Sequence, residues 1–369
     1  MNLDRRAFIA GSAIAIAGGA VAAALRGDEL HGTLLSAFED ARGDQYVGGV
    51  SFERRHVFGA RVPMRAHGCT VDPRNPQRVL FFARRPGMEA YELDLATLQA
   101  RVVFTTGTGR HLAGHGVFSS GGDLLYVPEH DYERARGVLT VRDARTFAIV
   151  HEIDTHGIDP HEVALSSDGR RLLVANGGIL THPRTFRRKL NIPTMDPSLC
   201  AIDAVRGECI EQWRLPDHLL SIRHLALAGD GTAAVGLQYE GGPAQAPGIV
   251  ALYRPAEGLK LLQAPAEERR RFRGYVASIA VSAPHDLIAA ACPYGEGVAC
   301  WSMTDGRYLG FLPANETYGL ARLTDGSVVG SQRDGSAYRI AEYRRRTEAI
   351  ALDRKQTIRW DDHWTYSDA

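Results

Sequence analysis

The chain has no excess of charge of either sign, because 43 lysines and arginines balance 43 aspartates and glutamates. This balance gives no indication of a nucleic-acid or other polyanionic partner. No convincing amphipathic helix is present, apart from the short basic stretch 266–274. With 44% hydrophobic residues the chain can still bury a sizeable core, so a disordered protein is not expected.

Several motifs of known catalytic and cofactor sites are also absent. The sequence has no C-x-x-C-H pattern, which excludes covalently attached haem of the c type. It has neither a G-x-S-x-G elbow nor a glycine-rich phosphate loop between a strand and a helix, so hydrolase and nucleotide chemistry have no support.

Cysteine is scarce, with five residues in the chain. Two pairs flank turns, namely Cys200 with Cys209 and Cys292 with Cys300. Either pair could form a disulfide in an oxidising compartment, or could remain as buried thiols. Cys69 is left over and is expected in the core rather than as a nucleophile.

Residues 1–26 have the features of a secretory signal peptide, with a positive start, an apolar core and small residues near its end. The pair Arg5-Arg6 and the glycine-containing core resemble a twin-arginine signal, and the glycines argue against a stable membrane anchor. We therefore expect twin-arginine export to the periplasm, a protein that is not integral to the membrane, and a folded domain over residues 33–369.

A strand–turn–strand pattern recurs along the rest of the chain. In the copy at 158–178, the turn Ser167-Asp168-Gly169 joins two apolar strands, and Asp-Gly between apolar runs is a strong hairpin signal. Further copies begin near residues 67, 115, 223, 277 and 318. A period of about 50 residues with four strands in each unit is typical of a β-propeller.

The N-terminal unit lacks its inner strand. Its segments 34–40, 46–51 and 56–62 match the second, third and fourth strands of the other units, and residues 360–364 provide a candidate for the first. The sequence therefore predicts an all-β, seven-bladed β-propeller of four-stranded blades, in which a C-terminal strand closes the last blade and removes an exposed sheet edge.

Histidine recurs at the first position of the inner strand in four units. Because inner strands line the channel of a propeller, these residues should meet at one mouth; they are His67, His115, His161 and His363. Imidazole is a common ligand of Fe, Cu and Zn, so we interpret the four as metal ligands, with Fe or Cu as the expected ion. The alternative is a set of histidines that hydrogen-bond to neighbouring blades and bind no metal.

Other polar side chains are predicted to surround this ring. Candidates for contact with a bound cofactor or ligand are Arg223, His224, Tyr318, Glu162 and Glu129. Glu129, in a predicted loop, and Glu162 are expected to orient the histidines, and Arg223 to pair with Glu162 or an anionic co-ligand. The long loop 177–199 is expected to cover the mouth with a positive rim.

Several phrases of the sequence together resemble one bacterial protein family. They include Gly114-His115-Gly116-Val117, Pro160-His161-Glu162, Ala175-Asn176-Gly177-Gly178 and Trp360-Asp361-Asp362-His363. The family consists of Tat-exported seven-bladed propellers that carry a domain of unknown function. The chain departs from its pattern at Asp362, where asparagine is usual, and at Gln45, where histidine is usual.

Genes of this family commonly neighbour those of imelysin-type iron-regulated proteins and di-haem peroxidase-like oxidoreductases. The resemblance therefore implies iron handling or redox work in the periplasm, with iron-uptake or redox proteins as partners. Three hypotheses follow: a metal-binding accessory protein of iron handling, a metal-dependent oxidoreductase, or a metal-free docking platform for another protein.

Overall fold

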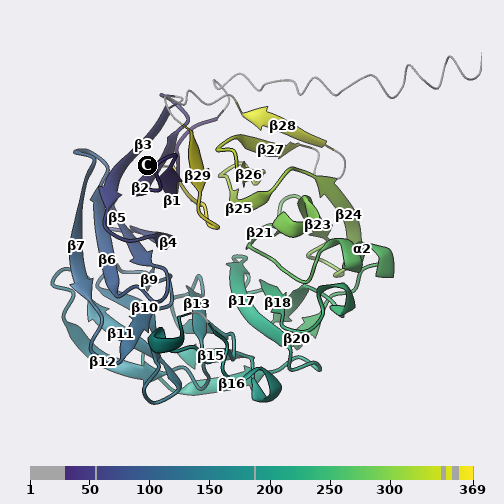
Figure 1. Cartoon of the computed structure of the whole chain (residues 1–369), viewed down its shortest axis with the longest axis horizontal. Helices are drawn as coiled ribbons and strands as arrows, with labels where there is room; N and C mark the ends of the chain where they lie inside the picture. Colours follow the sequence, from purple (N-terminus) through teal and green to yellow (C-terminus); the bar gives the residue numbers. More distant parts are fainter. Residues whose placement is uncertain (1–29, 55, 187, 342–345, 351–356, 369) are drawn as a thin grey trace, which may run out of the picture.

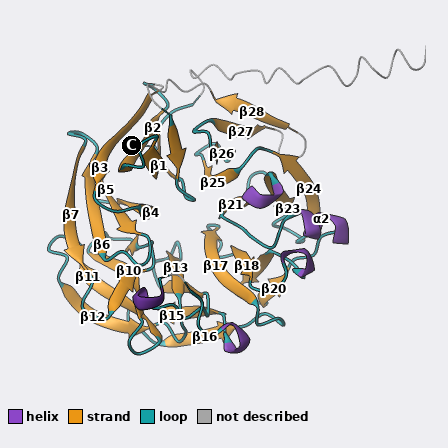
Figure 2. Cartoon of the chain, in the orientation of Figure 1, coloured by secondary structure: helices purple, strands orange, loops and turns teal. Residues whose placement is uncertain are grey.

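Seven antiparallel sheets follow one another around a central axis in the computed structural model (Figure 1). The structure describes residues 30–54, 56–186, 188–341, 346–350 and 357–368. The predicted signal peptide, residues 1–26, lies outside the described residues. Strands dominate the described chain, and its helices are short (Figure 2). The predicted seven-bladed, all-β propeller is confirmed.

The first three complete blades follow the chain in order. Blade 1 contains β4 (Ala66–Asp72), β5 (Asn75–Ala83), β6 (Glu89–Asp94) and β7 (Gln99–Thr105). Blade 2 contains β8 (Arg110–Leu112), β9 (Val117–Phe118), β10 (Leu124–Asp131), β11 (Arg136–Asp143) and β12 (Ile149–Asp154). Blade 3 contains β13 (Pro160–Leu165), β14 (Arg171–Asn176), β15 (Ser198–Asp203) and β16 (Cys209–Trp213).

The next three blades repeat the arrangement. Blade 4 contains β17 (Leu220–Leu227), β18 (Ala233–Tyr239), β19 (Val250–Arg254) and β20 (Gly258–Leu261). Blade 5 contains β21 (Ser278–Ser282), β22 (Leu287–Cys292), β23 (Gly297–Trp301) and β24 (Tyr308–Pro313). Blade 6 contains β25 (Thr317–Arg322), β26 (Val328–Gln332), β27 (Ala337–Ala341) and β28 (Arg346–Ile350).

Blade 7 joins the two ends of the folded chain. It contains β1 (Thr33–Asp40), β2 (Gln45–Ser51), β3 (His56–Val62), β29 (Ile358–Trp360) and β30 (Thr365–Ser367). Both C-terminal strands pair with β1, in a register that sets Phe38 opposite Trp360 and Leu35 opposite Thr365. Trp360 and Trp364 are buried in the core that these strands share with blade 6. The predicted closure by the C-terminus is confirmed, but two short strands on either side of residues 361–364 provide it, and not the single strand predicted at 360–364.

Short helices occur only in the connections of the described chain. They are α2 (Ala266–Arg271), η2 (Pro183–Thr185), η3 (Ile192–Thr194), η4 (Pro243–Gln245) and η5 (Pro293–Gly295). Among the described residues, no helix combines the length and the apolar character that a bilayer-spanning helix requires.

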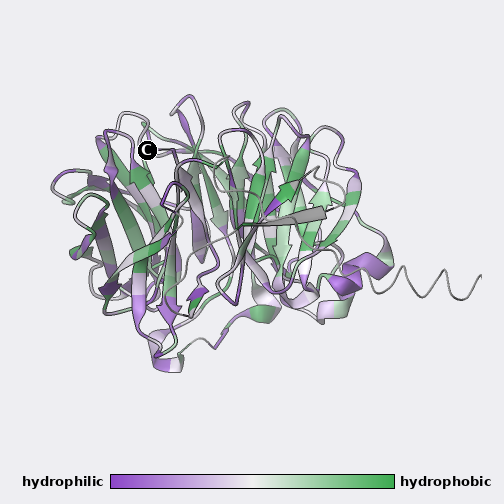
Figure 3. Ribbon diagram, turned by 90° about the horizontal axis from the view of Figure 1, so that it is seen from above, coloured by the Kyte–Doolittle hydropathy of each residue, from purple (hydrophilic) through white to green (hydrophobic). Residues whose placement is uncertain are grey.

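Apolar side chains fill the space between neighbouring blades. Strand β5 shows this best, because every residue from Val79 to Ala83 is fully buried. A continuous apolar run is expected where both faces of a strand pack against other sheets. The outer strand β12, by contrast, is mostly exposed. Figure 3 shows the hydrophobic strands within the body and hydrophilic segments around it.

The predicted Asp-Gly hairpin in blade 3 has the expected turn chemistry. Gly169 has a φ of +70°, a left-handed conformation that glycine adopts without a steric penalty. The carboxylate of Asp168 accepts hydrogen bonds from Ser166 Oγ at 2.6 Å and from the backbone N–H of Arg170 at 3.0 Å. The turn therefore fixes the register of β13 against β14.

The five cysteines are thiols in this structure. Cys200 Sγ and Cys209 Sγ lie 3.3 Å apart on adjacent strands. The other pair is out of register, because Cys292 lies opposite Gly297 and Cys300 lies opposite Ala289.

Candidate metal centre

Five histidines from separate blades meet where the inner strands begin. We call them the histidine cluster: His67 in β4, His115 between β8 and β9, His161 in β13, His224 in β17, and His363 between β29 and β30. The ring centroids of His67, His115 and His363 lie 4.4 to 5.0 Å from one another. The His224 ring lies 4.7 Å from that of His363 and 4.8 Å from that of His161. The structure thus brings together the four predicted ligands and adds His224.

The cluster contains two triads with the spacing of a metal site. One consists of His67, His115 and His161, and the other of His115, His224 and His363. Within each triad one nitrogen per ring lies within 4.8 Å of the others. The Nε2 atoms of His67, His115, His161 and His363 are buried and have no hydrogen-bond partner among the described residues. Buried polar atoms are normally paired, so these four nitrogens require an explanation.

Irregular backbone at the start of the inner strands sets the direction of these side chains. The pairing register shifts between Ala66 and Cys69, between Pro160 and Glu162, and between Ile222 and His224. A β-bulge re-aims side chains that would otherwise alternate between the two faces of a strand. The bulge in β17 accounts for the presence of both Arg223 and His224 at the site.

Two glycines allow the rings of His67 and His115 to approach the backbone. A Cβ atom at Gly68 would lie 2.6 Å from His115 Nδ1, and one at Gly114 would lie 2.8 Å from His67 Cδ2. Gly114 also has a φ of +104°. The two residues are joined across the blades by a 2.8 Å hydrogen bond from Gly68 N–H to Gly114 C=O.

A carboxylate on the closing segment fixes the orientation of His67. Its Nδ1 lies 2.6 Å from Asp361 Oδ1, and Arg65 forms an ion pair with the same carboxylate. Burial would raise the pKa of Asp361, but the charges of Arg65 and Arg84 hold it below its usual value. Asp361 is therefore ionised and accepts the proton of Nδ1, which leaves a lone pair on His67 Nε2.

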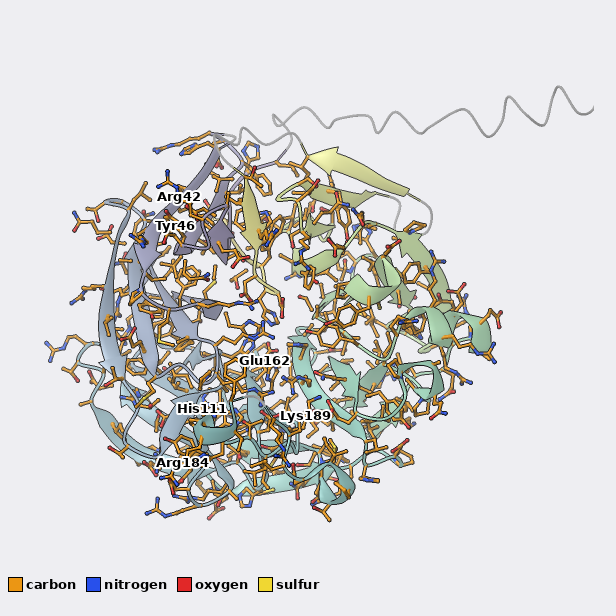
Figure 4. All side chains as sticks on the ribbon, in the orientation of Figure 1. Arg42, Tyr46, His111, Glu162, Arg184 and Lys189 are labelled. Atoms are coloured by element: carbon orange, nitrogen blue, oxygen red, sulfur yellow. The ribbon has the colours of Figure 1, made fainter. Side chains whose placement is uncertain are left out.

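Glu162 is the carboxyl group that contacts His224. Its Oε2 lies 3.2 Å from His224 Nδ1 and accepts a 3.2 Å hydrogen bond from the backbone N–H of Leu225. The other oxygen lies 3.9 Å from His115 Nδ1. Burial raises the pKa of Glu162 to about 8. Figure 4 shows Glu162 beside the central axis.

His161 has a different partner. Its Nδ1 lies 3.1 Å from Arg223 Nη2, and Arg223 Nη1 donates to Asp159 at 3.2 Å. The sequence suggested Glu162 or an anionic co-ligand as the partner of Arg223; the structure corrects the first of these, because the guanidinium pairs with Asp159 in the connection before β13. A guanidinium can only donate, so His161 Nδ1 is an acceptor, and the neutral ring carries its proton on Nε2.

The histidine cluster is uncharged at neutral pH. Burial lowers the pKa of His67, His115, His161 and His224 well below 6.5, and neighbouring histidine and arginine charges add to the effect. For His363, burial lowers the pKa to about 4 despite the nearby carboxylates of Asp362 and Asp361. Neutral imidazole is the form that binds a metal.

A cavity of about 190 Å³, called here the central cavity, lies beside the cluster. Its wall includes His67, His161, His224 and the cationic side chains Arg84, Arg85, Lys189 and Arg223. A second pocket of about 250 Å³, the outer pocket, shares Arg84, Tyr275 and Asp362 with it. Tyr318 lines the outer pocket, with its hydroxyl 3.4 Å from Arg333 Nη1, rather than the histidine cluster.

The loop 177–199 covers the mouth only in part. Lys189 reaches the central cavity and pairs with Glu240. Arg184, in contrast, is exposed, and Figure 4 shows it farther from the axis than Lys189. Arg187 lies outside the described residues.

Glu129 does not occupy the predicted position. It lies within β10 and not in a loop, and its buried carboxylate accepts hydrogen bonds from Arg142 at 3.0 Å and Thr140 at 2.9 Å. Because β10 extends to Asp131, this part of blade 2 remains regular sheet, and Glu129 is committed to an ion pair inside the blade.

Several residues of the site were missed at the level of sequence. They are Arg65, Arg84, Arg85, Asp159 and Tyr275. Arg84 and Arg85 could have been predicted from the sequence. They directly follow the second strand of their unit, which ends at the same mouth as the histidines. Asp361 and Asp362 adjoin His363 and could have been included for the same reason.

Solved structures with the same fold support the architecture alone. Kuenenia stuttgartiensis hydrazine synthase has a TM-score of 0.57 at 15% identity, covering 89% of this chain and 99% of that chain. A chain of the mitotic checkpoint complex has a TM-score of 0.55 at 12% identity, and the match covers 79% of this chain and 78% of that chain. The β-propeller domain of Myceliophteria thermophila Cps50 (Swd1) has a TM-score of 0.54 at 16% identity, and the match covers 73% of this chain and 80% of that chain.

Comparison at the level of sequence is more specific. No curated protein is significantly similar to the chain. Residues 60–367, which include every member of the histidine cluster, match the family DUF1513, whose description is "Protein of unknown function". The chain belongs to the DUF1513 family.

Proposed function

We propose that the protein binds a transition metal, Fe or Cu, through the triad His115, His224 and His363, with His67 from the neighbouring triad as a fourth ligand. The observation that carries this proposal is the set of buried Nε2 atoms on His67, His115 and His363 that have no partner among the described residues. A set of neutral imidazoles suits Fe, Cu or Zn better than Mg or Ca, which prefer oxygen ligands. When bound, the ion would supply a Lewis-acidic or redox-active centre.

The residues around the cluster fit this role. The ionised carboxylate of Asp361 holds His67 Nδ1 at 2.6 Å and so directs its Nε2 away, whereas the carboxyl group of Glu162, whose pKa burial raises to about 8, lies 3.2 Å from His224 Nδ1. Carboxylate partners of this kind orient ligating histidines in many metal sites and increase their basicity. Arg65 and Arg84 balance the charge of the acidic pair Asp361-Asp362.

The cellular role we propose is that of a periplasmic accessory protein in iron handling, exported by the twin-arginine pathway. The support is the N-terminal Arg5-Arg6 segment together with the nitrogen-rich centre. A metal-dependent oxidoreductase is the second candidate, and the central cavity favours it, because it leaves space for a small molecule beside the histidines.

Elemental analysis tests the proposal most directly. Protein exported through its native route and purified without chelators should contain stoichiometric Fe or Cu. His115→Ala and His363→Ala should lose most of this metal, because each removes a ring from the centre of the cluster. The matched control is His151→Ala, an exposed histidine on the outer strand β12. If all four proteins contained the same substoichiometric amount of metal, the proposal would be refuted. The hypothesis of a metal-free docking platform for another protein would then remain.

A further inference from the structure

We propose that the central cavity binds a small oxyanion, a carboxylate or a phosphate, with His161 as a hydrogen-bond donor to it rather than as a metal ligand. This inference rests on the metal centre proposed above and assigns the class of molecule that the centre would meet. It also gives a role to the one member of the histidine cluster that the proposed ligand set leaves out.

The first step is the proton on His161. Arg223 donates to Nδ1 at 3.1 Å, so the proton of the neutral ring is on Nε2. A nitrogen that carries a proton cannot also offer a lone pair to a metal. The Nε2 atom is buried and has no acceptor among the described residues, although the ring lines the central cavity. The missing partner is therefore a hydrogen-bond acceptor.

The second step is the charge of the wall. Arg84, Arg85, Lys189 and Arg223 line the central cavity, and Asp362 is the carboxylate among its described lining residues. Arg84 pairs with Asp362, and Lys189 pairs with Glu240. Arg223 is only 4% exposed, and it donates to a carboxylate, Asp159, that Arg85 also contacts at 2.7 Å. Guanidinium groups in this arrangement favour planar or tetrahedral oxyanions, which accept several N–H donors at once.

The third step is size. A cavity of about 190 Å³ holds roughly six waters at about 30 Å³ each. Pockets for drug-sized ligands usually exceed about 300 Å³. The cavity therefore fits an anion of a few non-hydrogen atoms and excludes a nucleotide or a large chelate.

The outer pocket shares Arg84, Tyr275 and Asp362 with the central cavity. Its wall has mixed charge, because the arginines Arg65, Arg84, Arg333 and Arg359 face the carboxylates Glu39, Asp361 and Asp362. The selectivity for an anion therefore depends on the wall of the central cavity itself.

Calorimetric titration with formate and with inorganic phosphate tests the inference, on both metal-loaded and chelator-treated protein. The two probes distinguish a carboxylate from a phosphate ligand. Lys189→Gln should weaken binding of the preferred anion by about tenfold, as expected for the loss of one charged contact. Arg184→Gln, a matched change on the same loop but outside the cavity, should bind as the wild type does. Equal binding by the two variants, or no binding of either probe to the wild type, would overturn the proposal.

Two variants at His161 test its role. His161→Leu should retain metal yet bind the anion about tenfold more weakly, and His161→Gln, which keeps an N–H group, should recover part of that affinity. Loss of metal from a folded His161→Leu protein would instead make His161 a ligand and overturn the assignment. If the wild-type protein bound the anion but no metal, only the proposed metal centre would be refuted. Failure of the metal proposal can therefore be distinguished from failure of the anion proposal.

Discussion

His67 and Asp361 are 294 positions apart in the chain, yet Nδ1 of the first lies 2.6 Å from Oδ1 of the second. The contact spans the junction between blade 1 and blade 7, where the C-terminal strands complete the ring. The closing segment thus supplies His363 as well as the carboxylate that orients another histidine. Closure of the propeller and assembly of the candidate site are the same structural event.

Asp361→Asn tests the orienting contact. The amide keeps the shape of the side chain but removes the charge that accepts the Nδ1 proton, so we expect metal affinity to fall by about 10- to 100-fold. Competition with a chromophoric chelator measures this change. Asp123→Asn, at a surface ion pair with Arg74, is the control and should leave metal affinity unchanged. Equal affinities in the two variants would show that Asp361 does not support the site.

Truncation before Ile358 tests closure. It removes β29 and β30 and exposes the edge of β1, which favours aggregation. It also removes buried Trp360 and Trp364, so we expect a loss of at least about 3 kcal/mol of stability. Thermal unfolding and size-exclusion chromatography detect both effects, with removal of residues 368–369 as the control. An unchanged melting temperature in a monomeric truncated protein would contradict the account.

Gly68→Ala should disturb the histidine cluster without a change in charge. The added methyl would meet His115 Nδ1 at 2.6 Å, so the ring must move, at a cost of about 1–3 kcal/mol. Metal content and chemical denaturation report the two consequences. At Gly107 a Cβ meets no described atom within 4 Å, so Gly107→Ala is the matched control. A normal metal content in Gly68→Ala would mean that close approach at this glycine is not needed.

The buried histidines predict acid sensitivity of the metal-free protein. The unfolded chain binds protons near pH 6.5, whereas burial keeps His363 neutral to about pH 4. Between these values the unfolded state holds more protons. The free energy of unfolding therefore falls as the pH decreases, by up to about 1.4 kcal/mol per pH unit for each such histidine.

Urea unfolding of chelator-treated protein at several pH values between about 7.5 and 5 measures this slope. His363→Gln should reduce it by roughly one proton. A stability that is independent of pH across this range would contradict the neutral, buried cluster.

The two kinds of hydrogen bond at Nδ1 predict opposite tautomers. His67 should carry its proton on Nδ1, facing Asp361, and His161 on Nε2, because Arg223 occupies its Nδ1. Nitrogen-15 spectra of histidine-labelled, metal-free protein distinguish the tautomers, with His67→Gln and His161→Gln providing the assignments. The same tautomer at both positions would contradict the hydrogen-bond pattern.

The sequence was sufficient to predict the propeller because each blade repeats the same turn and strand pattern. His67, His115, His161 and His363 could be found because channel geometry brings a repeated position to one place. The partners of these residues do not repeat. Asp159 has a left-handed φ of +60° in the connection before β13, and no spacing rule indicates that it meets Arg223.

The β-bulges could not be predicted from the sequence either. In a regular strand Arg223 and His224 would point to opposite faces, and the shift of register between Ile222 and His224 lets both reach the site. The prediction for Glu129 was wrong because it placed a residue of a regular strand in a loop. Its place after an apolar run suggested a loop, but pairing with β11 continues to Asp131 and holds it in the sheet.

The position of His363 so late in the chain has a consequence for biosynthesis. A ribosome makes His67, His115, His161 and His224 first, but none of the partial products contains the segment Asp361–His363. A prematurely terminated chain therefore lacks both a member of the histidine cluster and the support of His67. The fold thus completes the histidine cluster, and the carboxylate that orients His67, only in polypeptides that have been translated through their final strands.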